Sequence, residues 1–338
     1  MLNEILSNIV LRGREFLYLS RSDLERLNVS FDDVINWVES VLKIKDECVL
    51  PSKVGVYTRP KSFLHAMPAW VPPMNAVGVK IISGYAWNKQ KYGLPYIMGL
   101  MILNDEDSGA PYAVMDCSWP TEMRTAAVSA VSAKYLARED SEVLGVIGLG
   151  TQAKRHVQAL ARVLPIKEVK GYDISENAAK AFKSWVEGNV GVKVEIVSHS
   201  KNAVIGCDVV VSAIPISDKP THIVKPEWIS KGMTLIPIDF DASMDGKVAS
   251  KADKFYTDDL KQYAYYWSDE TPFFKGYPSP NEVFGEVAEV VRGEKSGRET
   301  AEEIIMVNNL GIAIVDVAVA INLFYRAIER GIGEKISL

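Results

Sequence analysis

The stretch that decides the fold runs from Glu142 to Asp173 and reads EVLGVIGLGTQAKRHVQALARVLPIKEVKGYD. It opens on an apolar run, Val143–Ile147, which predicts a short buried strand. The run leads into Gly148-Leu149-Gly150-Thr151-Gln152-Ala153, and apolar residues at helical spacing follow that turn. A second short apolar segment ends on Asp173. Strand, glycine turn, helix and second strand in this order predict a βαβ unit with a G-x-G-x-x-A turn.

The residue types in this turn are those that hold a dinucleotide. Gly148 permits the tight strand-to-helix turn, Gly150 lets the backbone approach a pyrophosphate, and Ala153 allows the helix to pack closely on the strand. The phosphates bind at the helix N-terminus, where free N–H groups and the helix dipole attract an anion. Asp173 accepts hydrogen bonds from ribose hydroxyls and repels a 2′-phosphate, so the sequence predicts NAD rather than NADP. A tight βα turn in some other α/β protein is the alternative.

The composition argues against several classes of protein. The net charge of −5 gives no basic footprint, so we expect no nucleic-acid partner. No apolar run reaches about 18 residues and no signal peptide is recognisable, so we expect no membrane span and a cytoplasmic protein. The three cysteines, Cys48, Cys117 and Cys207, are far apart and fit a reducing compartment. No C-x-x-C or H-x-x-x-H spacing indicates a metal site.

The length of 338 residues favours two domains. From Val54 to Val114, short apolar segments separated by Gly, Pro, Asn and Asp predict an antiparallel or mixed sheet. From Leu144 to Asp241, apolar runs alternate with helical patterns, which predicts a parallel, doubly wound sheet. The expected strands after the first are Val169–Asp173, Val192–Val197, Asp208–Ala213 and Thr234–Ile238.

Three helical segments complete the expected organisation. Ser30 with Asp33 is typical of a helix start. Thr121–Ala137 is rich in small residues, and Ala301–Arg330 is rich in Ala and Val; both predict long helices. We therefore predict an α/β fold: a Rossmann-type, doubly wound parallel sheet domain at residues 123–311, inserted into an α+β substrate-binding and dimerisation domain formed by residues 1–122 and 312–338.

Two cations stand out as candidates for binding a carboxylate. Lys80 lies inside an apolar strand, where a lysine needs a partner or a task. It could bind a substrate carboxylate or polarise a carbonyl or imine; an edge-strand lysine facing solvent is the alternative. Arg124 lies near the start of a helix of small residues, and its planar fork suits a carboxylate or phosphate. A surface arginine paired with Glu122 or Asp116 is the alternative.

Two aspartates follow the expected strand that ends near Ile238. Asp239 and Asp241 then lie at the carboxyl end of a parallel strand, where open α/β sheets bind ligands. A carboxylate there can donate or remove a proton beside a nicotinamide ring; loop aspartates that cap a turn are the alternative. An aromatic-rich stretch follows the aspartates and starts with Tyr263–Trp267. It has three interpretations: a lid over the cleft, a loop that packs on its own domain, or a contact to a second subunit.

Taken together, these motifs resemble the ornithine cyclodeaminase/mu-crystallin family over nearly the whole chain. The matching segments, in chain order, are Met67-Pro68, Gly78-Val79-Lys80, Leu103–Asp105 with Gly109–Pro111, Met123–Ala130, Ala133–Ala137, Gly148–Ala153, Lys225–Ile229 and the strand that ends at Asp241. The order of so many matches is more specific than the glycine turn alone.

The resemblance implies NAD(P) bound by the inserted domain, and a homodimer built through the domain of the terminal segments. The family's cyclodeaminases oxidise an α-amine by hydride transfer to NAD, lose ammonia, close a ring and return the hydride. Related members are amino-acid dehydrogenases and imine reductases. By the same resemblance, Lys80 and Arg124 hold the substrate carboxylate, and Asp241 assists proton transfer and recognises the distal amine.

The chain departs from the cyclodeaminase pattern at several positions. Lys53 stands where the family has an arginine, and His65 where it has a glutamate that accepts a cationic side chain. Asn308–Gly311 replaces the family's D-S-x-G before the last helix. A lysine is a point charge rather than a bidentate fork, so the geometry at the carboxylate changes. These departures disfavour ornithine as the substrate.

The sequence therefore predicts an NAD(H)-dependent enzyme that transfers hydride at the α-carbon of a small amino or imino acid, by cyclodeamination or by the related dehydrogenase or imine-reductase reaction. The alternative is a mu-crystallin-like dinucleotide-binding protein without significant turnover. The predicted catalytic residues are Asp241 and Lys80. The predicted substrate-binding residues are Lys53, His65, Met67, Lys80 and Arg124. The predicted cofactor-binding residues are Arg124, Thr125, Gly148, Gly150, Thr151, Gln152, Ala153, Asp173, Ser212, Ala213, Ile214 and Asp239.

Overall fold

The computed structural model describes residues 12–216, 219–268 and 270–338, which form two compact units. The first unit consists of the described part of Met1–Arg124 together with Ile312–Leu338, and the second is Thr125–Gly311. The chain thus leaves the first unit, builds the whole of the second, and returns.

The first unit is built on a mixed seven-stranded sheet with the order β15-β1-β6-β5-β4-β3-β2. All neighbouring strands pair antiparallel except β1 and β6, which are parallel. Its elements are β1 (Glu15–Leu19), α2 (Arg21–Arg26), α3 (Phe31–Lys43), η1 (Lys45–Glu47), β2 (Val54–Val56), β3 (Ser62–Val71), η2 (Pro72–Met74), β4 (Ala76–Tyr85), α4 (Asn88–Tyr92), β5 (Ile97–Asn104), β6 (Pro111–Asp116), the start of α5 (Ser118–Leu136), α11 (Ala313–Glu329) and β15 (Glu334–Ser337).

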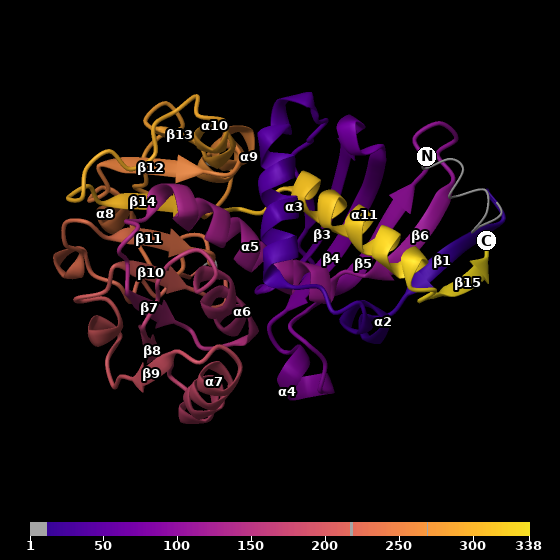
Figure 1. Ribbon diagram of the computed structural model, residues 1–338. Coiled ribbons are helices and arrows are strands. Elements are labelled where there is room, and N and C mark those ends of the chain that lie inside the picture. Colours follow the sequence, from indigo (N-terminus) through magenta and orange to yellow (C-terminus); the bar gives the residue numbers. More distant parts are fainter. Residues whose placement is uncertain (1–11, 217–218, 269) are drawn as a thin grey trace. The chain divides into compact units, whose positions relative to one another are not determined.

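One face of this sheet, the inner face, is covered by helix. α11 packs on β3, β4 and β5, and α3 packs against α11 (Figure 1). Ser30 caps α3 and forms a capping box with Asp33, as the sequence predicts. Asp33 also pairs with Arg326 of α11, so an ion pair joins the two helices. The inner face therefore presents its side chains to α11.

The opposite, outer face of the sheet is apolar although the helices do not cover it. Cross-strand neighbours share a face, and Ile81 pairs with Leu100 on one side and Ala66 on the other. Ile81 and Leu100 are 39% and 44% exposed, and Trp70 and Val54 on the neighbouring strands are also exposed. Contiguous exposed apolar surface of this kind marks an interaction site.

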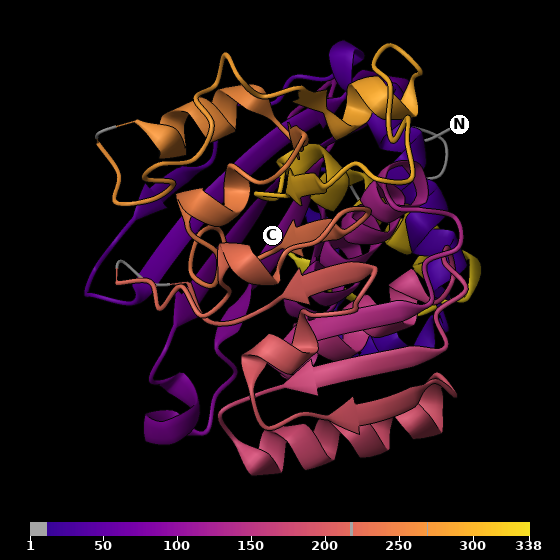
Figure 2. The same ribbon diagram turned by 90° about the vertical axis from the view of Figure 1, so that its left-hand side faces the viewer.

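The second unit is built on an eight-stranded sheet with the order β13-β12-β14-β11-β10-β7-β8-β9, and every pair in it is parallel (Figure 2). Its elements are β7 (Val143–Ile147), α6 (Thr151–Leu160), β8 (Glu168–Tyr172), α7 (Glu176–Asn189), β9 (Lys193–Ile196), η3 (Ser200–Ala203), β10 (Val209–Ser212), η4 (Pro226–Trp228), β11 (Thr234–Pro237), α8 (Gly246–Ala249), β12 (Lys254–Thr257), α9 (Leu260–Trp267), β13 (Gly285–Glu286), α10 (Val287–Val291) and β14 (Ile305–Asn308).

The strand order reverses between β7 and β10, because β8 and β9 continue on one side of β7 and β10 begins on the other. Such a switch point is where open α/β sheets bind ligands, beyond the carboxyl ends of the strands. The glycine turn follows β7, and Ala213 and Ile214 follow β10. The fold therefore brings both predicted cofactor segments to the switch point.

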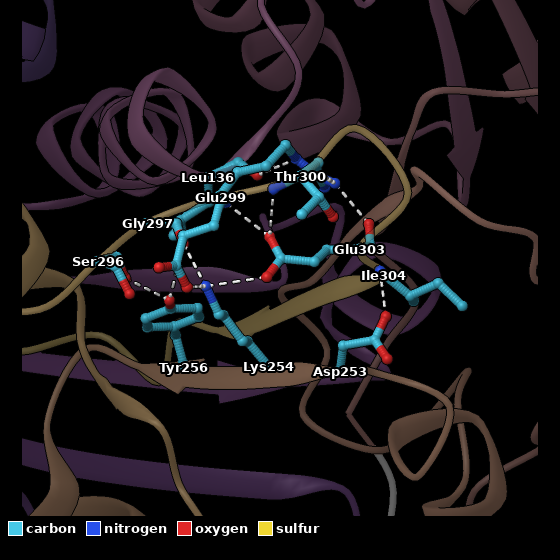
Figure 3. A network of polar contacts seen from close by, with 11 residues as sticks. Leu136, Asp253, Lys254, Tyr256, Ser296, Gly297, Glu299, Thr300, Glu303 and Ile304 are labelled. Carbon is cyan, nitrogen blue, oxygen red and sulfur yellow. Dashed lines mark hydrogen bonds and ion pairs between the residues drawn. The ribbon is translucent and has the colours of Figure 1, made fainter.

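A polar network closes the opposite, amino edge of this sheet (Figure 3). Lys254, at the start of β12, donates a hydrogen bond to Gly297 O at 2.8 Å and forms ion pairs with Glu303 at 3.0 Å and with Glu299. Arg298 donates to Leu136 O, the last residue of α5, and to the backbone oxygen of Glu303. These contacts hold the loop between α10 and β14 against the amino edge of the sheet.

The fold class predicted from the sequence is confirmed, and one predicted helix is wrong. Residues 301–330 were expected to form one helix, but Ile305–Asn308 is strand β14 and the helix begins only at Ala313. Ile305, Met306 and Val307 suit a buried strand. Gly311, with φ of +86°, then turns the chain before the helix.

The remaining expectations concern the membrane and the cysteines. None of the helices in the described part of the chain is long and apolar enough to cross a membrane. Cys48, Cys117 and Cys207 are free thiols. Within the aromatic stretch, Tyr263, Tyr266 and Tyr277 are buried in the core of the second unit, whereas Tyr265 and Trp267 are exposed.

Candidate functional site

The glycine turn has the geometry that an anion-binding loop requires. Gly148 has φ of +83°, and a Cβ at this position would lie 2.7 Å from Ala213 O, so no other residue fits without strain. Gly150 is the N-cap of α6 and supplies no side-chain cap, which leaves the first N–H groups of the helix open to a ligand. A Cβ on Gly150 would meet no described atom within 4 Å. No described atom therefore crowds the backbone of Gly150 at the helix N-terminus.

Asp173 holds this turn in place from the end of β8. Its Oδ2 accepts a hydrogen bond from Leu149 N at 2.7 Å, and its Oδ1 accepts one from Ser175 N at 2.8 Å. A carboxylate has about four acceptor positions, so two further hydrogen bonds fit. Asp173 thus shapes the glycine turn and retains capacity for ribose hydroxyls.

A second observation on α6 fits a dinucleotide. Gln152, in the first turn, has a buried Oε1 that meets no hydrogen-bond partner within the described residues. A buried acceptor without a donor is costly, and a donor group of a bound ligand would satisfy it. Ala153 is fully buried, as close packing of α6 requires, and Thr151 is exposed.

Asp239 joins the carboxyl ends of two central strands. Its Oδ1 accepts hydrogen bonds from Ser212 Oγ at 3.0 Å and Ser243 Oγ at 3.1 Å, and its Oδ2 accepts one from Ile214 N at 3.2 Å. Burial raises the pKa of Asp239 to about 7, although these hydrogen bonds favour the charged form. Ser212, Ile214 and Asp239 are therefore one cluster, and their predicted contact to a cofactor remains a prediction.

Asp241 lies two residues further and is bonded very differently. Its Oδ2 accepts a hydrogen bond from Phe274 N at 2.9 Å, whereas its Oδ1 is buried and has no hydrogen-bond partner in the described part of the chain. Burial raises the pKa of Asp241, and the Phe274 N–H opposes that shift. A carboxyl group with one anchored and one open oxygen is suited to accept or deliver a proton.

The backbone between the two aspartates is strained. Phe240 has φ of +59°, a left-handed conformation that is costly for a bulky residue. Its ring packs against Tyr266, Phe273 and Phe274 with centroids 5.0, 5.3 and 5.6 Å away. Asn308 Nδ2 also donates to Phe240 O at 3.2 Å. Aromatic packing therefore holds a conformation that directs Asp239 and Asp241 separately.

The first unit buries a cluster of three charged side chains. Lys80 Nζ lies 2.7 Å from Asp316 Oδ1, and Arg124 Nε lies 2.9 Å from the same oxygen. Burial lowers the pKa of Lys80 to about 8; Arg124 adds to this shift, and Asp316 opposes it. β4 is an interior strand, so Lys80 is not the solvent-facing lysine of an edge strand. The acid that pairs with Arg124 is Asp316, and Glu122 pairs with Arg21.

The other predicted substrate residues lie on the inner face of the same sheet. Met67 pairs across the strands with Lys80, and His65 lies two residues away on β3. The His65 ring stacks on Phe63 with centroids 4.4 Å apart. Burial, with the nearby charges of Lys53 and Lys80, lowers the pKa of His65 to about 3, so the imidazole is neutral. This part of the inner face combines aromatic surface with positive potential.

Sequence reasoning missed Asp316, the acid of this cluster. The signal was available: Asp316 is the one charged residue in the apolar run AIVDVAVAINLF at Ala313–Phe324. A carboxylate among such neighbours needs a buried partner. No group of three or more His, Cys, Asp or Glu side chains in the described residues could hold a metal ion.

A family model matches nearly the whole chain. The model for the ornithine cyclodeaminase/mu-crystallin family matches residues 15–331. The chain belongs to this family. The motifs that carried the resemblance, from Met67 to Asp241, all lie inside the matched range.

Relatives from this family resemble the chain over almost its full length. An alanine dehydrogenase from Archaeoglobus fulgidus is 38% identical over 329 residues, covering 95% of this chain and 98% of the relative. The structure of Thermococcus litoralis Δ1-pyrroline-2-carboxylate reductase, in complex with NADH and L-proline, is 32% identical with a TM-score of 0.88 and covers 95% of this chain and all of the other. An archaeal alanine dehydrogenase, a dimer with bound NAD, is 37% identical with a TM-score of 0.85 and covers 95% and 99%.

Proposed function

We propose that the chain is an NAD(H)-dependent enzyme that interconverts a small amino acid and its imino or oxo acid. The observation that carries this proposal is the buried cluster in which two cations, Lys80 and Arg124, share one carboxylate oxygen of Asp316. The cluster has a net charge of +1, which a substrate carboxylate would neutralise. A buried excess charge is costly unless a partner of opposite sign is bound.

The residues around the glycine turn would hold the cofactor. Gly148, Gly150 and the open N-terminus of α6 are proposed to bind the pyrophosphate, and Asp173 the adenosine ribose. Bound NAD accepts a hydride from a substrate carbon, and NADH returns one. We assign the cofactor residues as predicted from the sequence, including Arg124, Thr125 and the Ser212–Ile214 segment.

Asp241 is the proposed proton-transfer group. Its anchored Oδ2 fixes the carboxyl group, and its open Oδ1 is available to a proton on the reacting amine or on water. The raised pKa brings the group nearer to neutral pH, where general acid–base catalysis is most effective.

The surroundings of His65 favour the dehydrogenase or imine-reductase reaction over cyclodeamination of ornithine. Cyclodeamination needs a second, distal amine, and a distal ammonium group would meet a neutral imidazole near Lys53 and Lys80. Relatives that share more than 30% identity with the chain include alanine dehydrogenases and a Δ1-pyrroline-2-carboxylate reductase, which supports the same choice.

The experiment that tests the proposal is a substrate screen read at the nicotinamide absorbance. Amino acids are offered with NAD, and 2-oxo acids with ammonia or amines, as well as cyclic imines, are offered with NADH. We expect turnover with substrates of small, uncharged side chain. Tight NADH binding without turnover across the panel would instead identify a dinucleotide-binding protein, and no binding at millimolar NAD or NADH would contradict both.

The cofactor preference has its own test at Asp173. Asp173→Ala removes the carboxylate that repels a 2′-phosphate, so we expect weaker NADH binding and a shift of about tenfold or more toward NADPH. Fluorescence titration with each nucleotide measures both constants. An unchanged ratio of the two affinities would remove Asp173 from the ribose site.

We also propose that the protein forms a homodimer through the outer face of the first sheet. The exposed apolar rows around Ile81 and Leu100 support this, because such surface is rarely left to solvent. Light scattering should give twice the chain mass of 37.4 kDa. Ile81→Glu together with Leu100→Glu should yield monomers; a wild-type monomer would contradict the proposal.

A further inference from the structure

Asp316 is an acidic residue in a buried, apolar part of helix α11. It lies in the first turn of α11, among residues from Ala313 to Ile321 that are all buried. Its side chain is 3% exposed. A helix N-terminus favours a negative charge, but that effect is far smaller than the cost of burying a carboxylate. The reason for a carboxylate at this position therefore lies in the side chains that Asp316 contacts.

Those partners are arranged asymmetrically around the carboxylate. Lys80 and Arg124 both approach Oδ1, whereas Oδ2 is buried without a hydrogen-bond partner among the described residues. Arg124 uses Nε for this contact. The two terminal nitrogens of its guanidinium, which form the fork that grips a carboxylate, form no hydrogen bond or ion pair with the described residues.

The other titratable groups near Lys80 are neutral. His65, on β3, has its pKa lowered to about 3 by burial and by Lys53 and Lys80. Cys117, between β6 and α5, has its pKa raised to about 12, chiefly by burial. Asp316 on α11 is therefore the one negative charge that faces Lys80 in the described structure, and Arg124 on α5 is the second positive charge.

We propose that Asp316 is a positioning residue, which neutralises one of two buried cations and directs Lys80 and the guanidinium fork of Arg124 toward a single substrate carboxylate. The inference rests on the proposed function. It adds that the site is charge-matched to one carboxylate, because Lys80, Arg124 and Asp316 together retain one positive charge. Asp316 acts through the two cations and touches no reacting atom.

The test is Asp316→Asn, which preserves shape and removes charge. The cluster then carries +2, so Lys80 loses the group that raises its pKa, and protonated Lys80 persists only to lower pH. We expect the alkaline limb of kcat/KM to move to lower pH by about one unit, and KM for the carboxylate substrate to rise at least tenfold at pH 8. The Kd for NADH should stay within twofold.

Two further variants separate positioning from support of the fold. Asp316→Glu restores the charge, so the alkaline limb of the kcat/KM profile should return toward the wild-type pH, even if the longer side chain leaves KM raised. The same variant provides the test if Asp316→Asn does not fold. Asp33→Asn is the matched control, because Asp33 also pairs with an arginine and joins α3 to α11 through Arg326. It should lower Tm slightly and leave the pH profile and KM unchanged.

Either of two results would overturn the proposal: a folded Asp316→Asn with wild-type KM and pH profile, or equal losses in the Asp316 and Asp33 variants. If the wild-type protein turns over no substrate, the proposed function is wrong, but the role of Asp316 can still be tested by binding. Binding of L-alanine or propionate, measured by calorimetry, then decides the role of Asp316. Binding that is lost in Asp316→Asn supports it, and binding that is unchanged contradicts it.

Discussion

Two buried lysines in the described part of the chain, Lys80 and Lys254, have surroundings of opposite kinds. Lys254, at the amino edge of the parallel sheet, meets Glu299, Glu303 and Gly297 O (Figure 3), and its side chain is 7% exposed. Lys80, on the other sheet, is 2% exposed and shares one oxygen of Asp316 with a second cation. Burial disfavours the charge at both positions. The glutamates outweigh it and raise the pKa of Lys254, whereas the pKa of Lys80 falls to about 8.

This difference separates a structural charge from a functional one. The positive charge of Lys254 is compensated within the protein, so it holds a loop and needs nothing more. The charge of Lys80 is compensated only in part, which supports the proposal that a substrate anion binds there. Within one molecule, the degree of compensation is a better guide to function than burial alone.

Lys80→Met should produce the largest effect on activity. Loss of one partner of a desolvated charge pair costs about 2–5 kcal/mol, so kcat/KM should fall on the order of 10³-fold, at about 1.4 kcal/mol per tenfold. Arg124 and Asp316 remain as a balanced pair, so Tm should hold within a few degrees. Steady-state kinetics and thermal unfolding of the same preparation check both. Wild-type kcat/KM would remove Lys80 from the site.

Asp241→Asn extends the comparison to the aspartates. Proton transfer by a positioned side chain contributes about 10²–10⁴-fold, so we expect kcat to fall by about 10²-fold or more, with KM within threefold. Asp239→Asn is the control. Asp239 already accepts three hydrogen bonds within the protein, and asparagine resembles its protonated form, so kcat should fall by less than about tenfold. The reverse order of the two effects would show that the proton-transfer role belongs to Asp239.

Lys254→Met should lower stability and leave activity unchanged, which is the opposite of the result expected for Lys80→Met. Removing one partner of a buried ion pair costs about 3–5 kcal/mol, and we expect the lower end because Glu299 is 59% exposed. Tm should fall by several degrees, while kcat/KM of the folded protein should stay within twofold. Denaturant unfolding beside the kinetics measures the separation. A large loss of kcat/KM at unchanged stability would contradict the structural role of Lys254.

The smallest predicted effect is a pH dependence of stability at Asp239. Its pKa in the folded protein is about 7, above the ordinary value of 3.8. A carboxyl group whose pKa is raised by folding stabilises the protein fully below its ordinary pKa, and loses that contribution as pH rises to the folded value. The wild type should therefore lose stability from about pH 4 to 7 relative to Asp239→Asn. Parallel Tm curves for the two proteins would contradict the raised pKa.

Local chemistry could be predicted from the sequence, and distant pairing could not. The turn at Gly148 was predictable because strand, glycines, helix and Asp173 lie within one segment and each constrains the next. Lys80 attracted notice because its strand neighbours are apolar. Asp316, its partner, is 236 positions away, and no spacing rule connects two residues that only the fold brings together.

The error at residues 301–330 has a similar physical origin. Ile305–Asn308 is apolar and short, and such runs suit a buried strand as well as a helix. What decides for a strand is the pairing of Ile305 with Thr234 and Lys254, on two other strands. The glycine at position 311, with its positive φ, is the local sign of the boundary between this strand and the helix.

The left-handed backbone at Phe240 links hydrophobic packing to reactivity. A strained conformation of this kind costs roughly 1–3 kcal/mol and persists only when its surroundings enforce it. Tyr266, Phe273 and Phe274 supply that enforcement by ring contact. If Asp241 moves protons as proposed, trimming any of these rings would let the loop relax and swing the carboxyl group out of alignment. Natural variation at seemingly inert aromatic positions would thus tune turnover from a distance.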